Sequence, residues 1–185
     1  DLAVLYKGDK FFPEEIRSIE SGFRRTFLYV RGKLCGERID LIVCHLPSQL
    51  SRRENRLRAQ RRLATFVDSL HRADTSARII IAGDFNDTPD AASFEIIDGT
   101  LMNLGRKLHE RGEGTIRYEG KWDLIDMFMV SPGLDGRTDM EICRIPFLMT
   151  WERKHPGEKP LRTYSGPRYI GGVSDHCPII LKIYH

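Results

Sequence analysis

Residues 79–86 read IIIAGDFN, an apolar run that ends in a glycine and then two polar residues on either side of a phenylalanine. A short, nearly all-apolar stretch is typical of a strand buried on both faces of a sheet, and we place that strand at residues 78–82. Loops at strand ends on a rigid sheet are where catalytic groups tend to gather. The stretch therefore predicts a sheet-based fold and makes Asp84 and Asn86 candidates for chemistry.

Asp84 and Asn86 are two residues apart, so on an extended backbone their side chains project to the same side. If Phe85 packs inward, a carboxylate and a carboxamide face solvent together, where they can hold a hard cation or orient an attacking water. The alternative is an Asx-type turn, in which the two side chains satisfy nearby backbone amides. The motif taken alone is compatible with both interpretations.

The rest of the chain alternates strand-like and helix-like stretches. Apolar and β-branched runs predict strands at residues 2–6, 25–30, 38–44, 124–130 and 177–184. Apolar spacing of three and four residues predicts a helix over residues 51–73, and a short helix is expected at 90–97. A loop rich in Gly, Pro and Lys spans residues 155–172. With 185 residues and no linker, the pattern predicts one strand-rich α/β layered domain.

Three further polar motifs lie at the ends of predicted strands. They are residues 44–48 (CHLPS), 122–126 (WDLID) and 174–178 (SDHCP). Asp175 and His176 are adjacent, so their side chains diverge, and His176 needs a different carboxylate to stabilise its charged form. Asp126 is a candidate for that partner, because a lone carboxylate among apolar neighbours is costly to bury. A solvated Asp126 and a structural His45 are the plainer alternatives.

The composition indicates a globular chain with a mild positive charge. Hydrophobic residues make up 41% and charged residues 30%, and the formal net charge is +3. No apolar run reaches the ~20 residues that are needed to span a bilayer. The charge permits an anionic substrate such as a phosphate ester or a nucleic acid. Arginines crowd residues 52–62, where they form either a solvated helix face or a phosphate-attracting rim.

Candidate substrate contacts lie close to two of the polar motifs. Arg117, Tyr118 and Lys121 come shortly before Asp126, and cationic side chains there would neutralise a phosphoester. Ser48 ends the motif that contains His45 and is a further candidate for substrate binding. An ordinary polar loop is the plainer interpretation for each of these positions taken singly.

The four motifs, in this order, resemble the endonuclease/exonuclease/phosphatase superfamily. Gly-Asp-Phe-Asn at residues 83–86, followed much later by Ser-Asp-His-Cys-Pro at 174–178, is the most specific part of the resemblance. Residues 114–122 also look like a bacterial branch of this superfamily, and the match covers residues 2–183. The resemblance implies a four-layer α/β/β/α sandwich, in which two sheets pack face to face with helices outside.

The resemblance also implies roles for individual residues. Asp84 would orient or deprotonate the attacking water, and Asn86 would help to hold that water and the phosphate. His176 would contact the phosphate and stabilise charge in the transition state. Asp126 would pair with His176, and His45 would assist the leaving group.

The metal site implied by the resemblance is incomplete in this sequence. Asp175 would lie beside a Mg²⁺ or Mn²⁺ ion. The principal metal-binding glutamate and an active-site asparagine of the superfamily lie before the strand that residues 2–6 resemble, whereas Glu14, Glu15 and Glu20 follow it. We therefore expect residues 1–185 to be a single domain that lacks its N-terminal portion, with weak or no activity of its own.

The implied function is metal-dependent hydrolysis of phosphate esters. The substrate is either a nucleic acid, as for a nuclease or phosphodiesterase, or a small or lipid-derived phosphate, as for a phosphatase. A catalytically inactive fragment, or a binding or scaffold domain of the same fold, is the alternative. The residues whose retention favours the enzyme are Asp84, Asn86, Asp126, Asp175 and His176. The N-terminus shows no targeting pattern.

Overall fold

The apolar run at residues 79–84 forms strand β4 (Ile79–Asp84) near the middle of a six-stranded sheet. The computed structural model describes residues 2–184. The strands follow one another across this sheet in the order β1 (Phe11–Glu20), β2 (Thr26–Leu34), β3 (Glu37–His45), β4, β8 (Asp126–Val130) and β5 (Met102–Asn103). The β3–β4 pair is parallel and the other pairs are antiparallel. Because parallel strands end at the same edge of a sheet, the last residues of β3 and β4 lie side by side.

The isoleucines of β4 alternate between the two faces of the sheet. Ile79 and Ile81 have no exposed surface and pack into the larger of two apolar cores. Ile80 points the other way and packs with Val130 and Leu134 in the smaller core. The prediction of a strand buried on both faces is therefore confirmed.

Helix α1 (Arg53–Ala73) covers one face of the six-stranded sheet. Its side chains Leu63, Val67 and Leu70 recur at three- and four-residue steps, and they join the core that contains Ile81. The spacing that predicted a helix in this part of the chain therefore also determines which side of the helix faces the sheet.

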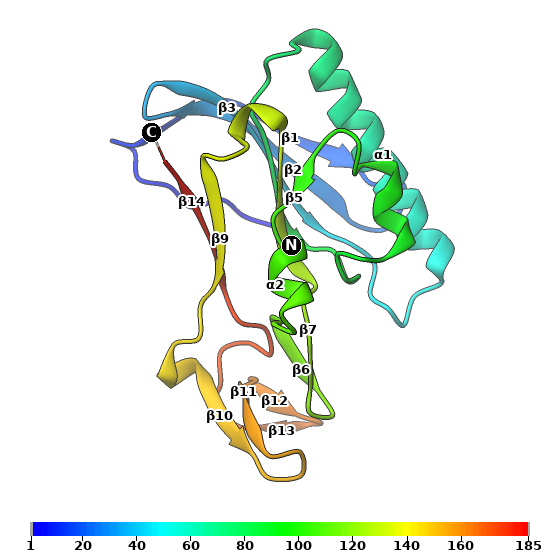
Figure 1. The fold of residues 1–185 in the computed structure, drawn as a ribbon, viewed down its shortest axis with the longest axis vertical. Coiled ribbons are helices and arrows are strands. Elements are labelled where there is room, and N and C mark those ends of the chain that lie inside the picture. Colours follow the sequence, from blue (N-terminus) through cyan, green and yellow to red (C-terminus); the bar gives the residue numbers. More distant parts are fainter. Residues whose placement is uncertain (1, 185) are drawn as a thin grey trace.

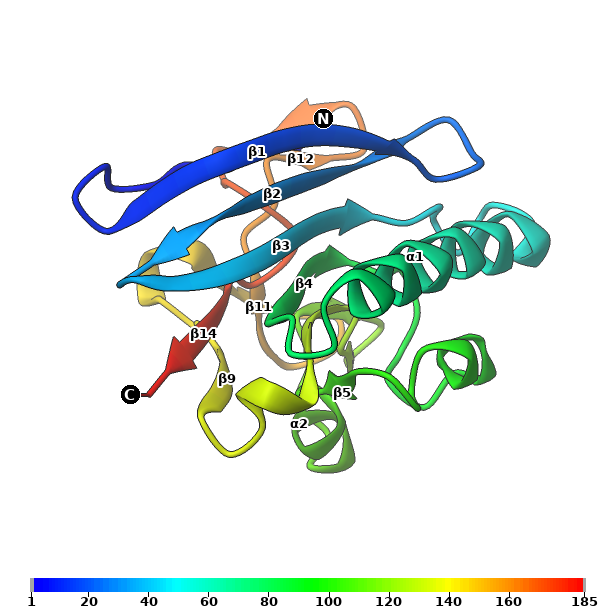
Figure 2. The ribbon, with the colours of Figure 1, turned by 90° about the horizontal axis from the view of Figure 1, so that it is seen from above.

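A second, two-stranded sheet lies against the opposite face. It consists of β9 (Thr138–Ile142) and β14 (Ile179–Ile183), which pair in antiparallel fashion. Leu181 and Ile183 of β14 pack against the core around Ile80. The described chain is thus an α/β structure with α1, the six-stranded sheet and the two-stranded sheet as successive layers (Figure 1 and Figure 2).

Three short hairpins gather at one end of the molecule (Figure 1). They pair β6 (Ile116–Tyr118) with β7 (Lys121–Asp123), β10 (Met149–Glu152) with β11 (Gly157–Pro160), and β12 (Tyr164–Ser165) with β13 (Arg168–Tyr169). We call this part, residues 116–123 and 149–169, the hairpin lobe. The expectation of a loop over residues 155–172 is wrong in part, because short strands interrupt it.

Short helices complete the described part of the chain. They are the 3-10 helices η1 (Ala92–Ile96), η2 (Pro132–Leu134) and η3 (Pro146–Leu148), and the α-helix α2 (Arg106–Glu110). The helix expected at residues 90–97 is present as η1. None of the helices within residues 2–184 is long and apolar enough to cross a membrane.

The N-terminal segment differs from the expectation. Residues 2–6 form no strand, so that prediction is wrong, and residue 1 lies outside the described part. The first strand is β1, which the sequence analysis missed because it is an edge strand with more exposed than buried positions and no regular apolar alternation. Glu14 and Glu15 in β1 form ion pairs with basic residues of β2 and β3, and Glu20 ends the strand.

Candidate active site

Three of the predicted site residues lie side by side at one edge of the six-stranded sheet. His45, the last residue of β3, pairs in register with Asp84, the last residue of β4. Asp84 in turn pairs with Asp126, the first residue of β8. Because β8 runs antiparallel to β4, its start meets the end of β4, and backbone pairing alone brings the three motifs together.

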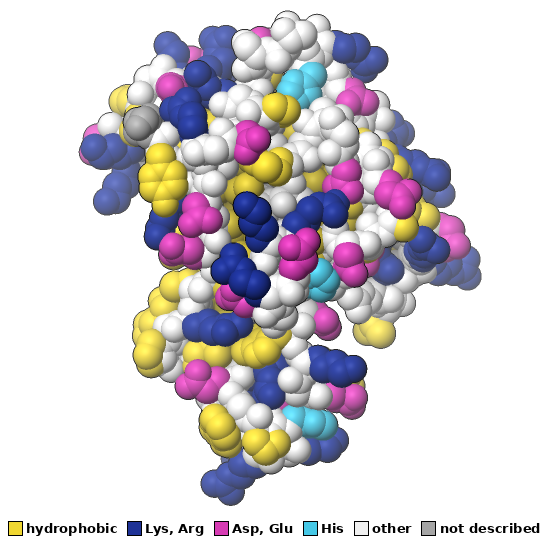
Figure 3. All heavy atoms as spheres, viewed as in Figure 1, with side chains coloured by type: hydrophobic (Ala, Val, Ile, Leu, Met, Phe, Trp, Pro, Cys, Tyr) yellow, Lys and Arg dark blue, Asp and Glu magenta, His cyan; other side chains and the backbone are white. Residues whose placement is uncertain are grey.

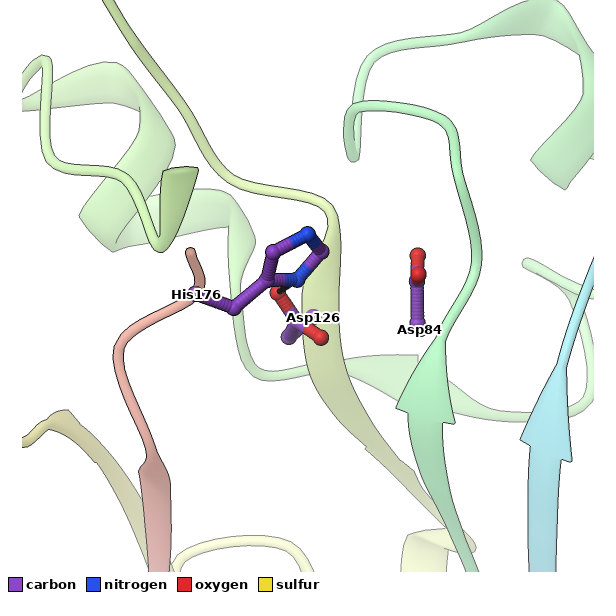
Figure 4. A group of neighbouring side chains, drawn as sticks. All are labelled: Asp84, Asp126 and His176. Atoms are coloured by element: carbon purple, nitrogen blue, oxygen red, sulfur yellow. Dashed lines mark hydrogen bonds and ion pairs between the residues drawn. The ribbon is translucent and has the colours of Figure 1, made fainter. Parts of the chain in front are cut away.

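His176 reaches this edge from the loop that precedes β14. Its backbone forms an isolated bridge with Ile116, and the next residue, Cys177, donates its N–H to the Thr115 carbonyl over 2.7 Å. These contacts place the His176 Nδ1 atom 2.8 Å from Asp126 Oδ2. Figure 4 shows the imidazole above Asp126 with its second nitrogen directed away from that carboxylate. The predicted pairing of Asp126 with His176 is present in the structure.

Thr115 belongs to this site, although the sequence analysis gave it no role beyond its place in the segment 114–122. It is fully buried, and its hydroxyl donates to Asp126 Oδ2 over 2.6 Å. The same hydroxyl oxygen accepts the Asp126 N–H over 3.3 Å. Thr115 therefore fixes the carboxylate that orients His176. In the sequence, Thr115 is only a lone threonine after a glycine, which is a weak signal. In the structure, a Cβ added at Gly114 would lie 2.6 Å from the Asp123 nitrogen, so the chain approaches closely there.

The Gly-Asp-Phe-Asn motif forms the Asx-type turn, and the expectation that Asn86 faces solvent beside Asp84 is wrong, because the Asn86 side chain is buried. Phe85 is fully buried, and the Asn86 N–H donates to Asp84 Oδ1 over 2.8 Å, which is an Asx-type contact. Asn86 has a left-handed backbone with φ of 52°, and its side-chain amide donates to the Leu46 carbonyl over 3.0 Å. The Asn86 side chain thus ties the β3 loop to the β4 loop, while the Asp84 carboxylate points past the sheet edge (Figure 4).

The surroundings of the site shift the pKa values of Asp84, His176 and His45. Burial, and then the negative charge of Asp126, raise the pKa of Asp84 to about 6. Burial by itself would lower the pKa of His176, but the hydrogen bond and the charge of Asp126 outweigh it and raise that pKa. Burial and the charge of Arg25 lower the pKa of His45. His45 Nε2 lies 3.4 Å from Asp84 Oδ2, so at neutral pH this contact joins a carboxylate to a neutral imidazole.

Asp84→Asn is expected to stabilise the metal-free protein at pH 8 by about 1–3 kcal/mol, which raises Tm by about 3–8 °C. The folded-state pKa of about 6 lies above the ordinary value of 3.8. The protonated form therefore stabilises the fold below pH 4, and this contribution is lost as the pH rises through 6. Calorimetry in EDTA at pH 8 and pH 4 measures the difference. The gain should shrink at pH 4, and an equal gain at both values would contradict the raised pKa.

The side chains of Asp84, Asp126 and His176 offer ligand atoms of the kinds that bind divalent cations. One ligand atom from each of Asp84, Asp126 and His176 lies within 4.8 Å of the other two. Carboxylate oxygens are the ligands that Mg²⁺ and Mn²⁺ prefer in proteins. Two carboxylates this close also repel each other, and a cation between them would relieve that repulsion.

The remaining predicted site residues lie outside this cluster. Asp175 precedes His176, but its half-exposed carboxylate pairs with Arg162 over 3.2 Å. Ser48 is exposed in the loop after β3, and its carbonyl accepts a bond from Arg56 over 3.1 Å. The other three belong to the β6–β7 hairpin: Arg117 is almost buried there, and Tyr118 and Lys121 are exposed.

Comparison with known proteins gives the same fold. The model of the Endonuclease/Exonuclease/phosphatase family matches residues 1–185, while no curated protein matches the sequence. A mannosyl-6-phosphatase from Bacteroides thetaiotaomicron is 16% identical with a TM-score of 0.66, over 97% of this chain and 69% of that one. TDP2 from D. rerio, complexed with a single-strand DNA product, is 14% identical with a TM-score of 0.59, over 95% and 68%.

A third similar structure is beta toxin from Staphylococcus aureus, a mutant with bound magnesium ions. It is 17% identical with a TM-score of 0.55, over 85% of this chain and 57% of that one. At such identities the likeness shows the fold alone. The family model covers the whole sequence, and this chain therefore belongs to the endonuclease/exonuclease/phosphatase family.

Proposed function

We propose that this protein hydrolyses phosphate esters with the help of a divalent ion, Mg²⁺ or Mn²⁺. The observation that carries the proposal is the convergence of Asp84, Asp126 and His176 at one sheet edge, from three motifs far apart in the sequence. Family membership supports it. The magnesium ions bound to beta toxin support the choice of metal.

Asp84 and Asp126 are the carboxylates that would hold the ion. Asp175 is a further candidate ligand, on the same loop as His176, and its present partner is Arg162. A bound Mg²⁺ or Mn²⁺ ion would polarise the phosphoryl group and neutralise the leaving oxygen.

The chain's own residues supply the proton transfer and part of the charge stabilisation. At neutral pH Asp84 is mostly ionised, so its carboxylate at the sheet edge can take a proton from the attacking water. Asp126 raises the pKa of His176 and so favours its charged form, which can donate from Nε2 to a phosphoryl oxygen. His45 lies beside Asp84 and is the candidate for exchanging a proton with the leaving group. Asn86 holds the turn that presents Asp84.

Hydrolysis should depend on the metal and fall to background in EDTA. The panel should contain phosphomonoesters, phosphodiesters and single- and double-stranded nucleic acids, each with Mg²⁺, Mn²⁺ or EDTA. Activity on nucleic acid should fall steeply with salt, because phosphate contacts release counterions. Hydrolysis that persists in EDTA would contradict the metal, and no hydrolysis of any ester would favour an inert binding or scaffold domain.

The complete architecture is a further part of the proposal. We infer that the chain forms one domain of a four-layer α/β/β/α sandwich. The α1 layer and the two packed sheets support this inference, as does the likeness to larger proteins of which the chain spans 57–69% in the three structures above. The fourth layer would be helical and would cover the β9–β14 sheet. An experimental structure of the protein with any flanking sequence is the direct check.

A further inference from the structure

One arginine on helix α1 differs from its neighbours in burial. Five of the arginines at residues 52–62 are exposed, and basic side chains line the right-hand edge of the molecule, over α1, in Figure 3. The Arg56 side chain, by contrast, is only 12% exposed. A buried guanidinium destabilises a fold unless its charge is paired and its N–H groups are hydrogen-bonded. Arg56 therefore requires partners inside the protein, and none of the steps proposed for hydrolysis involves it.

The partners of Arg56 lie in the two loops that follow β3 and β4. Its Nη1 atom donates to the Ser48 carbonyl over 3.1 Å. Its Nε atom lies 3.5 Å from Asp87 Oδ2. Ser48 comes three residues after His45, and Asp87 comes three residues after Asp84. One side chain thus connects the loops that follow the two members of the His45–Asp84 pair.

The Asp87 carboxylate is also held from a second side. Ser93, a buried residue of η1, donates its hydroxyl to Asp87 Oδ2 over 2.9 Å. The same carboxylate oxygen therefore meets α1 through Arg56 and η1 through Ser93. The Asp87 side chain is 21% exposed, so water and salt screen its charge less than they screen a surface charge. Asp87 is thus a fixed anchor for the loop after β4.

Arg56 provides the second of two connections between these loops. Closer to the sheet edge, the Asn86 side-chain amide donates to the Leu46 carbonyl over 3.0 Å. Farther along the loop after β3, Ser48 is exposed and Leu50 is fully exposed, so apolar burial does not hold this part in place. A single contact would let one loop pivot against the other. Two contacts fix both their separation and their relative orientation.

The burial of Arg56 is better explained by positioning than by stability. A buried ion pair seldom stabilises a fold more than well-packed apolar side chains would. Gln60, one turn later on α1, is 5% exposed, and neither its Nε2 nor its Oε1 atom has a hydrogen-bond partner within residues 2–184. This side of α1 therefore carries polar groups that do not favour stability, as is common beside functional sites.

The loop after β4 also orients the Asp84 carboxylate. Strand pairing places the backbones of His45 and Asp84, but the Asp84 side chain is held by the Asn86 N–H, which donates to Oδ1 over 2.8 Å. Asp87 is the next residue after Asn86. A shift of Asp87 would therefore reach the Asp84 carboxylate through one peptide unit.

We propose that Arg56 is a positioning residue, which holds the loops after β3 and β4 together and so directs the Asp84 carboxylate toward His45. His45 Nε2 and Asp84 Oδ2 are 3.4 Å apart, so a small movement of either loop would break their contact. A misplacement of about 1 Å can lower a reaction rate about 10²-fold. The proposal rests on the proposed phosphoesterase function and adds a residue that acts on it through other side chains.

The effect on the loops can be measured without any reaction. Amide hydrogen exchange should be followed by NMR in EDTA for the native protein and for Arg56→Met. The N–H groups of Leu46 and Phe85 bond to backbone oxygens across the sheet edge, over 2.8 Å each. Their exchange should become about 10-fold faster in the variant, because the loops open locally, while exchange at Val67 in α1 stays the same. Unchanged exchange at Leu46 and Phe85, or an equal rise at Val67, would overturn the proposal.

Kinetics separate positioning from folding and from substrate binding. At a temperature where circular dichroism shows each variant folded, Arg56→Met should lower kcat about 10–100-fold and change KM less than about 3-fold. Arg56→Lys should recover part of the loss, because its ammonium can pair with Asp87 but cannot span both loops as the guanidinium does. Arg61→Met is the matched control, because Arg61 is an exposed arginine of the same helix, and it should keep the native kcat.

The kinetic outcomes decide the proposal as follows. A native kcat in Arg56→Met, or an equal fall in Arg61→Met, would overturn it. If Arg56→Met does not fold, Asp87→Asn takes its place, because it removes the ion pair, keeps an oxygen that can accept from Ser93, and should lower kcat to a similar extent. If the native protein hydrolyses no ester, the proposed function fails, and the exchange measurement still decides whether Arg56 holds the loops.

Discussion

Asp84→Ala is expected to lower kcat/KM for a phosphate ester by about 10²–10⁴-fold while the protein stays folded. The Asp84 carboxylate is the one group of the cluster that combines a position at the sheet edge with a pKa of about 6. Removal of it takes away the proposed proton acceptor for water and one of the two carboxylates proposed to hold the metal. Steady-state kinetics with Mg²⁺ or Mn²⁺, together with circular dichroism, measures both parts of the prediction.

Asp68→Ala is the matched control, because Asp68 is an exposed carboxylate on helix α1. It should keep nearly full activity. Near-native hydrolysis by Asp84→Ala would remove the proposed role. His176→Ala and Asp126→Asn offer a second check: the two residues share one hydrogen bond, so the loss of activity in the double variant should be smaller than the product of the two single losses.

Gly83→Ala is expected to destabilise the protein by more than about 3 kcal/mol. Gly83 lies in β4 directly before Asp84 with φ of 150°, and a Cβ there would lie 1.9 Å from the Cys44 carbonyl oxygen. Both the backbone conformation and the close approach of β3 exclude a side chain. The methyl group would force β3 and β4 apart at the point where His45 pairs with Asp84. Thermal unfolding should show a Tm lower by about 6–12 °C, or no folded protein at all.

Gly99→Ala provides the comparison for this substitution. A Cβ at Gly99 meets nothing within 4 Å, so its effect on the free energy of unfolding should stay within about 1 kcal/mol. Equal Tm values for the two variants would show that the β3–β4 approach is looser than the geometry indicates.

The sequence predicted the interior of the fold better than its edges. The isoleucines of β4 and the spaced apolar residues of α1 are buried, and burial imposes a periodicity that can be read directly. Strand β1 was missed and residues 2–6 were assigned in its place, because an edge strand with exposed charges has little apolar alternation. The strands of the hairpin lobe were not predicted for a similar reason, since they are short and have few buried residues.

The candidate site also contains residues that the sequence predicted and one that only the structure showed. Local chemistry pointed to Asp84, Asp126 and His176, because buried carboxylates and a histidine at strand ends need partners. Thr115 carried no such signal, since a threonine after a glycine is ordinary in a loop. Only the bond from its hydroxyl to Asp126 shows that it belongs to the site.

The sequence by itself predicted that β4 is buried on both faces, which side of α1 is buried, and which polar residues follow the ends of strands. These features follow from contacts between near neighbours in the chain. The tertiary structure alone decided that His45, Asp84 and Asp126 stand in register and that His176 meets Asp126 across 50 residues of chain. It also decided that Arg56 of α1 contacts the loops after both β3 and β4. Strand order, register and the approach of distant loops depend on packing between segments far apart in sequence, which no local pattern encodes.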